Sequence, residues 1–179
     1  RCFALASIQI PSGVNSIGEE AFWACESLTS IVLPEGITQI ASRAFSGAGL
    51  TSIVIPESVT SIGAEAFFVC TKLTSITIPS SVTSIGSNAF SGCENLTEVH
   101  ISNLEAWCKI NFASIYSNPL PYALNIYLNG KLLTDLNLSS NITSVAPYAF
   151  YGCWCIETVS VSTALNSIGD RAFYGCPAI

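Results

Sequence analysis

The eight cysteines are the most reactive side chains of this 179-residue chain, since thiols can form disulfides or hold a metal ion. Six of them recur at one place of an internal repeat, namely Cys2, Cys25, Cys70, Cys93, Cys153 and Cys176. Ala48 fills that place in a further copy. A place that accepts either residue is small, buried and apolar, because free cysteine packs as a small hydrophobe. We therefore expect reduced, structural thiols.

Other arrangements that could support catalysis or hold a metal are missing. Cys153-Trp154-Cys155 has no matching Cys or His pair close in sequence, which leaves too few ligands for zinc. His100 is the only histidine, no serine stands in a G-x-S-x-G pattern, and no glycine-rich phosphate loop occurs. We therefore expect no catalytic residue, no cofactor and no metal, and thus a protein that is not an enzyme.

The chain is organised by repetition. The stretch "LTSIVIPESVTSIGAEAFFVCTK" begins at Leu50, and "LTSITIPSSVTSIGSNAFSGCEN" follows it directly. Repeats of this kind cannot bury their apolar face alone and stack into a solenoid. Copies begin at Leu5, Leu28, Leu50, Leu73, Leu133 and Ile156. Regular repeats therefore cover 5–95 and 133–178, with an irregular insertion at 96–132, and we expect 1–179 to form one solenoid domain.

Each place in the repeat has a physical use. Leu50, Ile53 and Ile55 alternate as in a short strand that points every second side chain into a core, and Pro56 ends that strand. A second extended segment follows in "VTSI", and Gly63 is expected to permit a tight corner. The Ala66-Phe67 pair recurs in each regular copy, so stacked phenylalanines should form a continuous column.

These features predict an α/β solenoid of the leucine-rich-repeat kind. We expect a right-handed superhelix with a parallel sheet on its concave side, and with short helical turns and the second extended segments outside. The strands of that sheet should lie around Ile8, Ile31, Ile53, Ile76, Val99, Leu136 and Val159.

The insertion is expected to contain a helix and a hairpin. Leu104, Trp107 and Cys108 have the spacing of one apolar helical face, and a Ser or Asn before them could cap the helix. Asn129-Gly130 stands between apolar runs, which is the strongest short signal for a two-residue hairpin turn. The result should be one enlarged coil with a protruding hairpin.

The frame "LTSIxIPxxVTSIGxxAFxxC" resembles the BspA-type leucine-rich repeat of surface proteins in host-associated bacteria and some protists. The resemblance covers essentially the whole chain and departs from the pattern at Ser139 and Ser162, which replace the proline. It implies an extracellular or cell-surface location and an adhesin-like role in binding host proteins or other ligands, without enzymatic activity.

Composition narrows the possible partners. Half of the residues are apolar, a tenth are charged, and the net charge is −6 with scattered Lys and Arg, so we expect no nucleic-acid partner. No run approaches the roughly 18 apolar residues of a membrane span. Both ends cut the repeat in mid-frame, so we expect a fragment of a longer array, with possible end-to-end contacts through uncapped ends.

The outward strand places change character along the chain. They carry short, nearly uncharged side chains in the N-terminal copies, but Glu98, His100, Tyr127, Asp135 and Asn137 around and after the insertion. A tyrosine among groups that can hydrogen-bond suits recognition, so we expect these five residues to bind a protein or glycan ligand. Two alternatives remain open: a structural spacer that presents other domains, and a carbohydrate-binding surface formed by the Ser/Thr rows.

Overall fold

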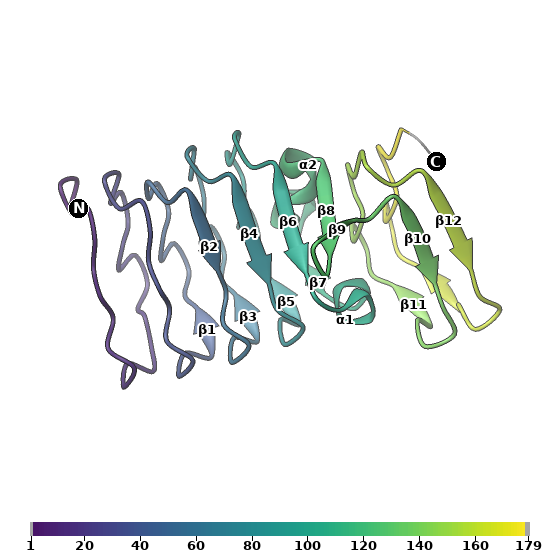
Figure 1. Cartoon of the computed structure of the whole chain (residues 1–179), viewed down its shortest axis with the longest axis horizontal. Helices are drawn as coiled ribbons and strands as arrows, with labels where there is room; N and C mark the ends of the chain where they lie inside the picture. The colour runs from purple at the N-terminus through teal and green to yellow at the C-terminus, as the bar shows by residue number, and fades with distance from the viewer. Residues whose placement is uncertain (1, 178–179) are drawn as a thin grey trace.

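A computed structural model describes residues 2–177 of the chain as coils stacked along one axis, with the first and last described coils at opposite ends of the stack (Figure 1). The coils that begin at Leu50, Leu73, Leu133 and Ile156 each contribute one short strand to each of two sides, whereas the coil at Leu28 contributes only one and the coil at Leu5 none. The predicted solenoid with parallel sheets is therefore confirmed.

The larger sheet carries the strands that the sequence analysis placed on the concave side. Its strands run in the order β2-β4-β6-β8-β9, and all neighbours are parallel except β8 and β9. Their bounds are β2 Ser52–Val54, β4 Ser75–Ile78, β6 Glu98–Ile101, β8 Asn125–Leu128 and β9 Lys131–Leu132. After the insertion, β10 (Asp135–Leu138) and β12 (Thr158–Val161) form a separate parallel pair.

The "VTSI" segments are extended, as predicted, and they also pair into a second sheet, which was not predicted. It consists of β1 (Gln39–Ile40), β3 (Ser61–Ile62), β5 (Ser84–Ile85) and β7 (Asn111–Phe112), all parallel. A separate pair, β11 (Ser144–Val145) and β13 (Ser167–Ile168), continues it beyond the insertion.

Two of the predicted strands are not found. The segments around Ile8 and Ile31 run beside the sheet without forming strands. The Ile31 side chain is nevertheless buried, whereas Ile8 is 39% exposed. Ile8 belongs to the first coil, which has a neighbour on one side only, so neither its backbone nor its side chain is held from both sides.

The phenylalanines form the predicted column. Successive rings are stacked 5.3 to 5.6 Å apart and within 7° of parallel, in the series Phe22, Phe45, Phe67 and Phe90. Phe150 and Phe173 form a second stack with a spacing of 5.3 Å. The column is thus interrupted at the insertion, where Trp107 packs edge-on against Phe112.

Five of the six repeat cysteines are buried, as expected of a small apolar place, whereas Cys2 in the first turn of the chain is exposed. They also make a contact that the sequence did not predict. The thiols of Cys70 and Cys93 donate to the carbonyls of Phe45 and Phe67 one coil earlier, at 3.0 and 3.1 Å. Burial raises the pKa of Cys70 to about 12, which keeps it a thiol near neutral pH. The reduced state of the protein in solution stays a prediction.

The insertion has the predicted helix and hairpin. Helix α1 spans Leu104–Cys108, and the Asn103 side chain accepts a hydrogen bond from the backbone N–H of Ala106, as an N-cap does. A 3₁₀ helix, η1 (Ile115–Ser117), and a short helix, α2 (Leu120–Ala123), follow. Asn129 and Gly130 both have positive φ, as the two-residue turn requires. The hairpin does not protrude, because β8 pairs with β6 and extends the larger sheet.

Two buried side chains of the insertion continue a ladder of hydrogen bonds between coils at a place where the backbone of the insertion does not continue it. In regular coils the phenylalanine N–H donates to the alanine carbonyl of the next coil, as from Phe67 to Ala89 at 2.8 Å. The carbonyl of Ala149 instead accepts from Trp107 Nε1 at 2.9 Å and from Asn118 Nδ2 at 3.1 Å. An unpaired buried carbonyl would be costly, so these two residues keep the coils in contact across the insertion.

Gly63 is required for a different reason from the expected tight corner. Its φ is not in the left-handed region; that conformation falls at Glu65, two residues later, with φ 56°. A Cβ at Gly63 would lie 2.6 Å from the backbone nitrogen of Ser42 in the preceding coil. Ala41 stands at the same place one coil earlier, so the restriction at Gly63 comes from the local approach of two backbones.

This close approach predicts a difference between two glycines at the same place of the repeat. Gly63→Ala should lower the free energy of unfolding by about 1–3 kcal/mol, because backbone atoms must move apart. Gly18→Ala should change it by less than about 0.5 kcal/mol, since nothing lies within 4 Å of a Cβ there. Denaturant unfolding of both variants measures the difference, and equal losses would contradict the proposed role of coil contact.

Candidate binding surface

The outward side chains of the larger sheet form two rows, because parallel strands place equivalent residues side by side. The first, the polar row, contains Ser52, Ser75, Glu98 and Asn125. The second, the aromatic row, contains Val54, Thr77, His100, Tyr127 and Leu132. Val54 and Leu132 are 66% and 42% exposed, so the aromatic row carries apolar surface at both ends.

Glu98, His100 and Tyr127 form the centre of this face. The rings of His100 and Tyr127 are stacked with centroids 4.9 Å apart, and Nε2 of His100 lies 3.0 Å from Oε2 of Glu98. The three side chains are only partly buried, so Tyr127 lies on the surface of the sheet and not in the core. Stacking fixes the orientation of both rings before any ligand arrives.

Asp135 and Asn137 lie apart from these three residues. Both are exposed, but they belong to β10, which pairs with β12 and has no strand pairing with β9. The Asp135 carboxylate accepts hydrogen bonds from the hydroxyls of Thr158 at 2.6 Å and Thr134 at 3.0 Å. These bonds, that of Thr158 first, lower the pKa of Asp135. The five predicted residues are therefore divided between two sheets.

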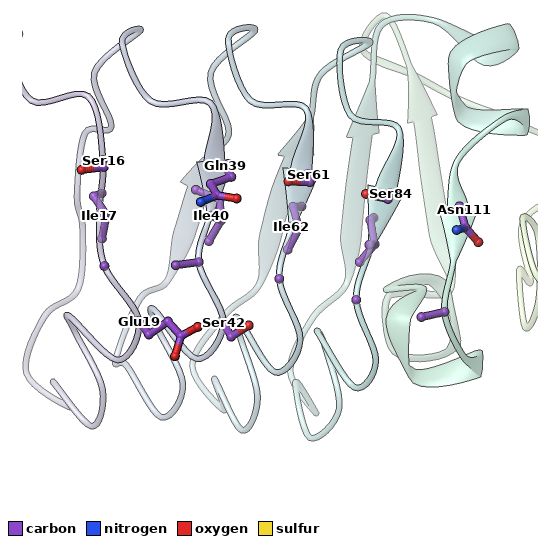
Figure 2. Close-up of a pocket in the computed structure, with 16 residues that line it drawn as sticks. Ser16, Ile17, Glu19, Gln39, Ile40, Ser42, Ser61, Ile62, Ser84 and Asn111 are labelled. Atoms are coloured by element: carbon purple, nitrogen blue, oxygen red, sulfur yellow. The ribbon is translucent and has the colours of Figure 1, made fainter.

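A groove crosses the second sheet, on residues that the sequence analysis did not consider for binding. It has a volume of about 520 Å³ and runs over five consecutive coils. Figure 2 shows its row of polar side chains, the serine groove, formed by Ser16, Gln39, Ser61, Ser84 and Asn111. The signal in the sequence was the polar residue before the isoleucine of "VTSI", which recurs as Ser or Gln. The row offers hydroxyl and amide groups without a charge of its own, while Glu19 lies near one end.

Metal clusters and membrane-spanning helices were two further possibilities for the described part of the chain. Residues 2–177 contain no group of three or more His, Cys, Asp or Glu side chains placed to hold a metal ion. Among the helices in these residues, none has the length and apolar character needed to cross a membrane.

Stacked coils with a parallel sheet on one side and a second run of short strands on the other define a leucine-rich-repeat solenoid. The chain belongs to the BspA type leucine rich repeat family, whose profile matches residues 1–118 and 123–179 in six copies. No curated protein matches the sequence closely enough to count as a relative.

Solved structures of bacterial repeat proteins are similar to this chain. A leucine rich cell surface protein from Faecalibacterium prausnitzii is 40% identical over 61% of this chain, with a TM-score of 0.59. This chain covers 29% of that protein, and so spans less than a third of its length. The T. pallidum leucine rich repeat protein is 23% identical, with 97% of this chain and 78% of that chain covered and a TM-score of 0.63.

The pneumococcal vaccine antigen PcpA is also similar in structure. It is 23% identical, with 97% of this chain and 49% of that chain covered, and its TM-score is 0.55. At this identity, as for the T. pallidum protein, the likeness shows a shared fold.

The hydrogen bond between β10 and β12 predicts a pH effect. Thr158→Val removes the hydroxyl that contributes most to the low pKa of Asp135, so that pKa should rise toward its ordinary value. The depressed pKa contributes stability that is present above the unfolded-state pKa and lost as the pH falls through the folded-state pKa. The variant should lose that contribution. NMR titration of the Asp135 carboxyl carbon measures the shift.

The matched control is Thr134→Val, which removes the longer of the two hydrogen bonds. It should raise the pKa of Asp135 by less than Thr158→Val does. An unchanged titration in both variants would mean that Asp135 is not held by β12.

Proposed function

We propose that the chain is a non-enzymatic cell-surface interaction module that binds a host protein or another extracellular ligand through the outward face of the larger sheet. The binding centre consists of Glu98, His100 and Tyr127. Asp135 and Asn137 on β10 serve as secondary contacts for a ligand long enough to reach across β9.

The stack of His100 on Tyr127 is the observation that supports this proposal most directly. Rigid aromatic side chains with polar tips are typical centres of protein recognition, because they bury much apolar area at a small cost in conformational entropy. Here they are partly exposed, fixed by stacking at 4.9 Å and adjacent to a carboxylate. The exposed Val54 and Leu132 provide apolar surface on both sides.

Membership of the BspA-type family fits an interaction module and supports the surface location. The Faecalibacterium prausnitzii protein that shares 40% identity over part of this chain is described as a cell surface protein. We extend that location to this chain as part of the proposal. The proposed partner is a protein, because the aromatic row is a partly exposed face of five strand residues with apolar side chains at both ends, whereas small-molecule sites are concave pockets.

Two other roles make different predictions. A spacer that presents other domains would bind nothing itself. Carbohydrate binding is supported by the serine groove, whose hydroxyl and amide groups match the hydrogen-bonding groups of a glycan. Its residues lie on the second sheet, so substitutions there leave the aromatic row intact and the two surfaces can be tested separately.

Binding should depend on Tyr127 when the purified chain is screened against a panel of extracellular host proteins by biolayer interferometry. For a protein partner found in this way, Tyr127→Ala should weaken binding by more than about 1 kcal/mol, or roughly fivefold in Kd, because it removes the central ring. Tyr116→Ala is the matched control, since this tyrosine is 46% exposed and lies on η1. Thr51→Ala should also have little effect.

A parallel glycan array separates the alternatives. Glycan binding that is lost in Gln39→Ala and retained in Tyr127→Ala would assign function to the serine groove. Equal losses for Tyr127→Ala and Tyr116→Ala would contradict a localised site on the larger sheet. Absence of any protein or glycan ligand would favour the spacer.

A further inference from the structure

Cys155 is a cysteine that the repeat does not explain. It stands two residues after Cys153, where other copies carry the exposed polar residues Lys72 and Asn95. The small apolar place that accounts for the other repeat cysteines is already filled by Cys153. Cys155 is only half-buried and follows Trp154, which is 59% exposed.

The insertion also changes the surroundings of Cys153. In regular coils the cysteine thiol donates to the phenylalanine carbonyl of the preceding coil, as Cys176 does to Phe150 at 3.1 Å. The coil before Cys153 is the insertion, which lacks the Ala-Phe pair. The Cys153 sulfur instead lies 3.7 Å from the Cys155 sulfur, close enough for the two thiols to share a hydrogen bond.

The pair has one sulfur that can react and one that is protected. A hydrogen bond from the Cys153 thiol is the main cause that lowers the pKa of Cys155, so its thiolate is more populated than that of an ordinary cysteine. The same hydrogen bond and burial raise the pKa of Cys153. The backbone N–H of Ile126 lies 3.5 Å from the Cys155 sulfur and also favours the thiolate.

We propose that Cys153 and Cys155 form a redox-active dithiol that is oxidised reversibly by a low-molecular-weight disulfide of the glutathione type. The Cys155 thiolate attacks the disulfide, forms a mixed disulfide and releases one thiolate, which takes up a proton. Cys153 then loses its proton to solvent and attacks the Cys155 sulfur, which releases the second thiol. The net reaction converts two protein thiols and one small disulfide into one protein disulfide and two small thiols.

The dithiol is coupled to the candidate binding surface through β8. Ile126, whose N–H contacts the Cys155 sulfur, directly precedes Tyr127 in this strand. The Cys155 thiol also lies 3.5 Å from the carbonyl of Leu133, just after β9. Disulfide formation moves the Cys155 sulfur toward Cys153 and changes its contacts with Ile126 and Leu133. Oxidation therefore alters the hydrogen bonding of the backbone next to Tyr127.

Thiol trapping in defined glutathione buffers tests the proposal. The experiment uses the full chain with Cys2→Ser, because Cys2 is exposed and would form disulfides between molecules. After equilibration at a series of reduced-to-oxidised glutathione ratios, free thiols are blocked with N-ethylmaleimide and mapped by peptide mass spectrometry. We expect the free thiols of Cys153 and Cys155 to disappear together as one intramolecular disulfide forms. Both free thiols should reappear when the glutathione ratio is reversed. The buried Cys25, Cys70 and Cys93 should stay reduced.

Two variants serve as controls. Cys155→Asn should fold, since Asn95 stands at the same repeat place, and should form no disulfide at Cys153. Cys108→Ser, which changes another cysteine outside the repeat place, should leave the oxidation unchanged. Circular dichroism checks the fold of each variant. If either variant fails to fold, the peptide map of the parent protein alone decides whether Cys153 and Cys155 form the disulfide.

Three results would overturn the proposal. They are a stable glutathione adduct on Cys155 that Cys153 does not resolve, a disulfide between a different pair, and full retention of both thiols at every ratio while the protein stays folded.

Discussion

Contact between neighbouring coils is the constraint on which the rest of this structure depends, because no coil covers its own apolar residues. Equivalent isoleucines in inner coils and in end coils can be compared within this chain. Ile53 and Ile62 lie in inner coils and are 3% and 2% exposed, whereas Ile8 and Ile168 occupy the equivalent places in end coils and are 39% and 54% exposed. The sequence at these places is the same, so a neighbour on each side accounts for burial. The parallel strands, the phenylalanine stacks and the glycine at position 63 all follow from this one requirement.

The insertion shows what is needed to interrupt such an array without separating it. Trp107 and Asn118 replace one lost backbone donor, and both are almost completely buried at a place where an unpaired carbonyl would be costly. The replacement is local, however. The larger sheet ends at β9, and Cys153 loses the carbonyl that its counterparts bond. The aromatic stack on β6 and β8 and the thiol pair, which contacts the backbone of β8 at Ile126, both lie at this interruption. Both unusual features of the chain are therefore found at the irregular coil.

Much of the fold could be predicted from the sequence, because the same pattern of apolar, proline and glycine positions is written six times. The strand around Ile53, the cap and helix at Asn103–Cys108 and the turn at Asn129-Gly130 each depend on local rules and were predicted correctly. The candidate site was predicted less completely. Glu98 and His100 share a face by the strand period, but the separation of Asp135 from Tyr127 depends on where the antiparallel strand β9 lies. The thiol–carbonyl bonds arise between coils, and the serine groove forms only where the polar residues before the isoleucine of "VTSI" line up in successive coils.

The division of the stack also bears on how the protein would come apart. Up to Phe90, and again from Phe150, adjacent coils share ring stacking and several backbone hydrogen bonds. Between these blocks the described residues share no strand pairing. The bonds that cross are scattered ones, such as those from Ala146 to Cys108 and from Trp154 to Leu124 and the side-chain bonds of Trp107 and Asn118. In a nearest-neighbour array, cooperativity passes only through such junctions. Under heat or mechanical tension we therefore expect the stack to separate first at the boundary with the insertion. The C-terminal coils can then unfold as a unit while the N-terminal block stays folded.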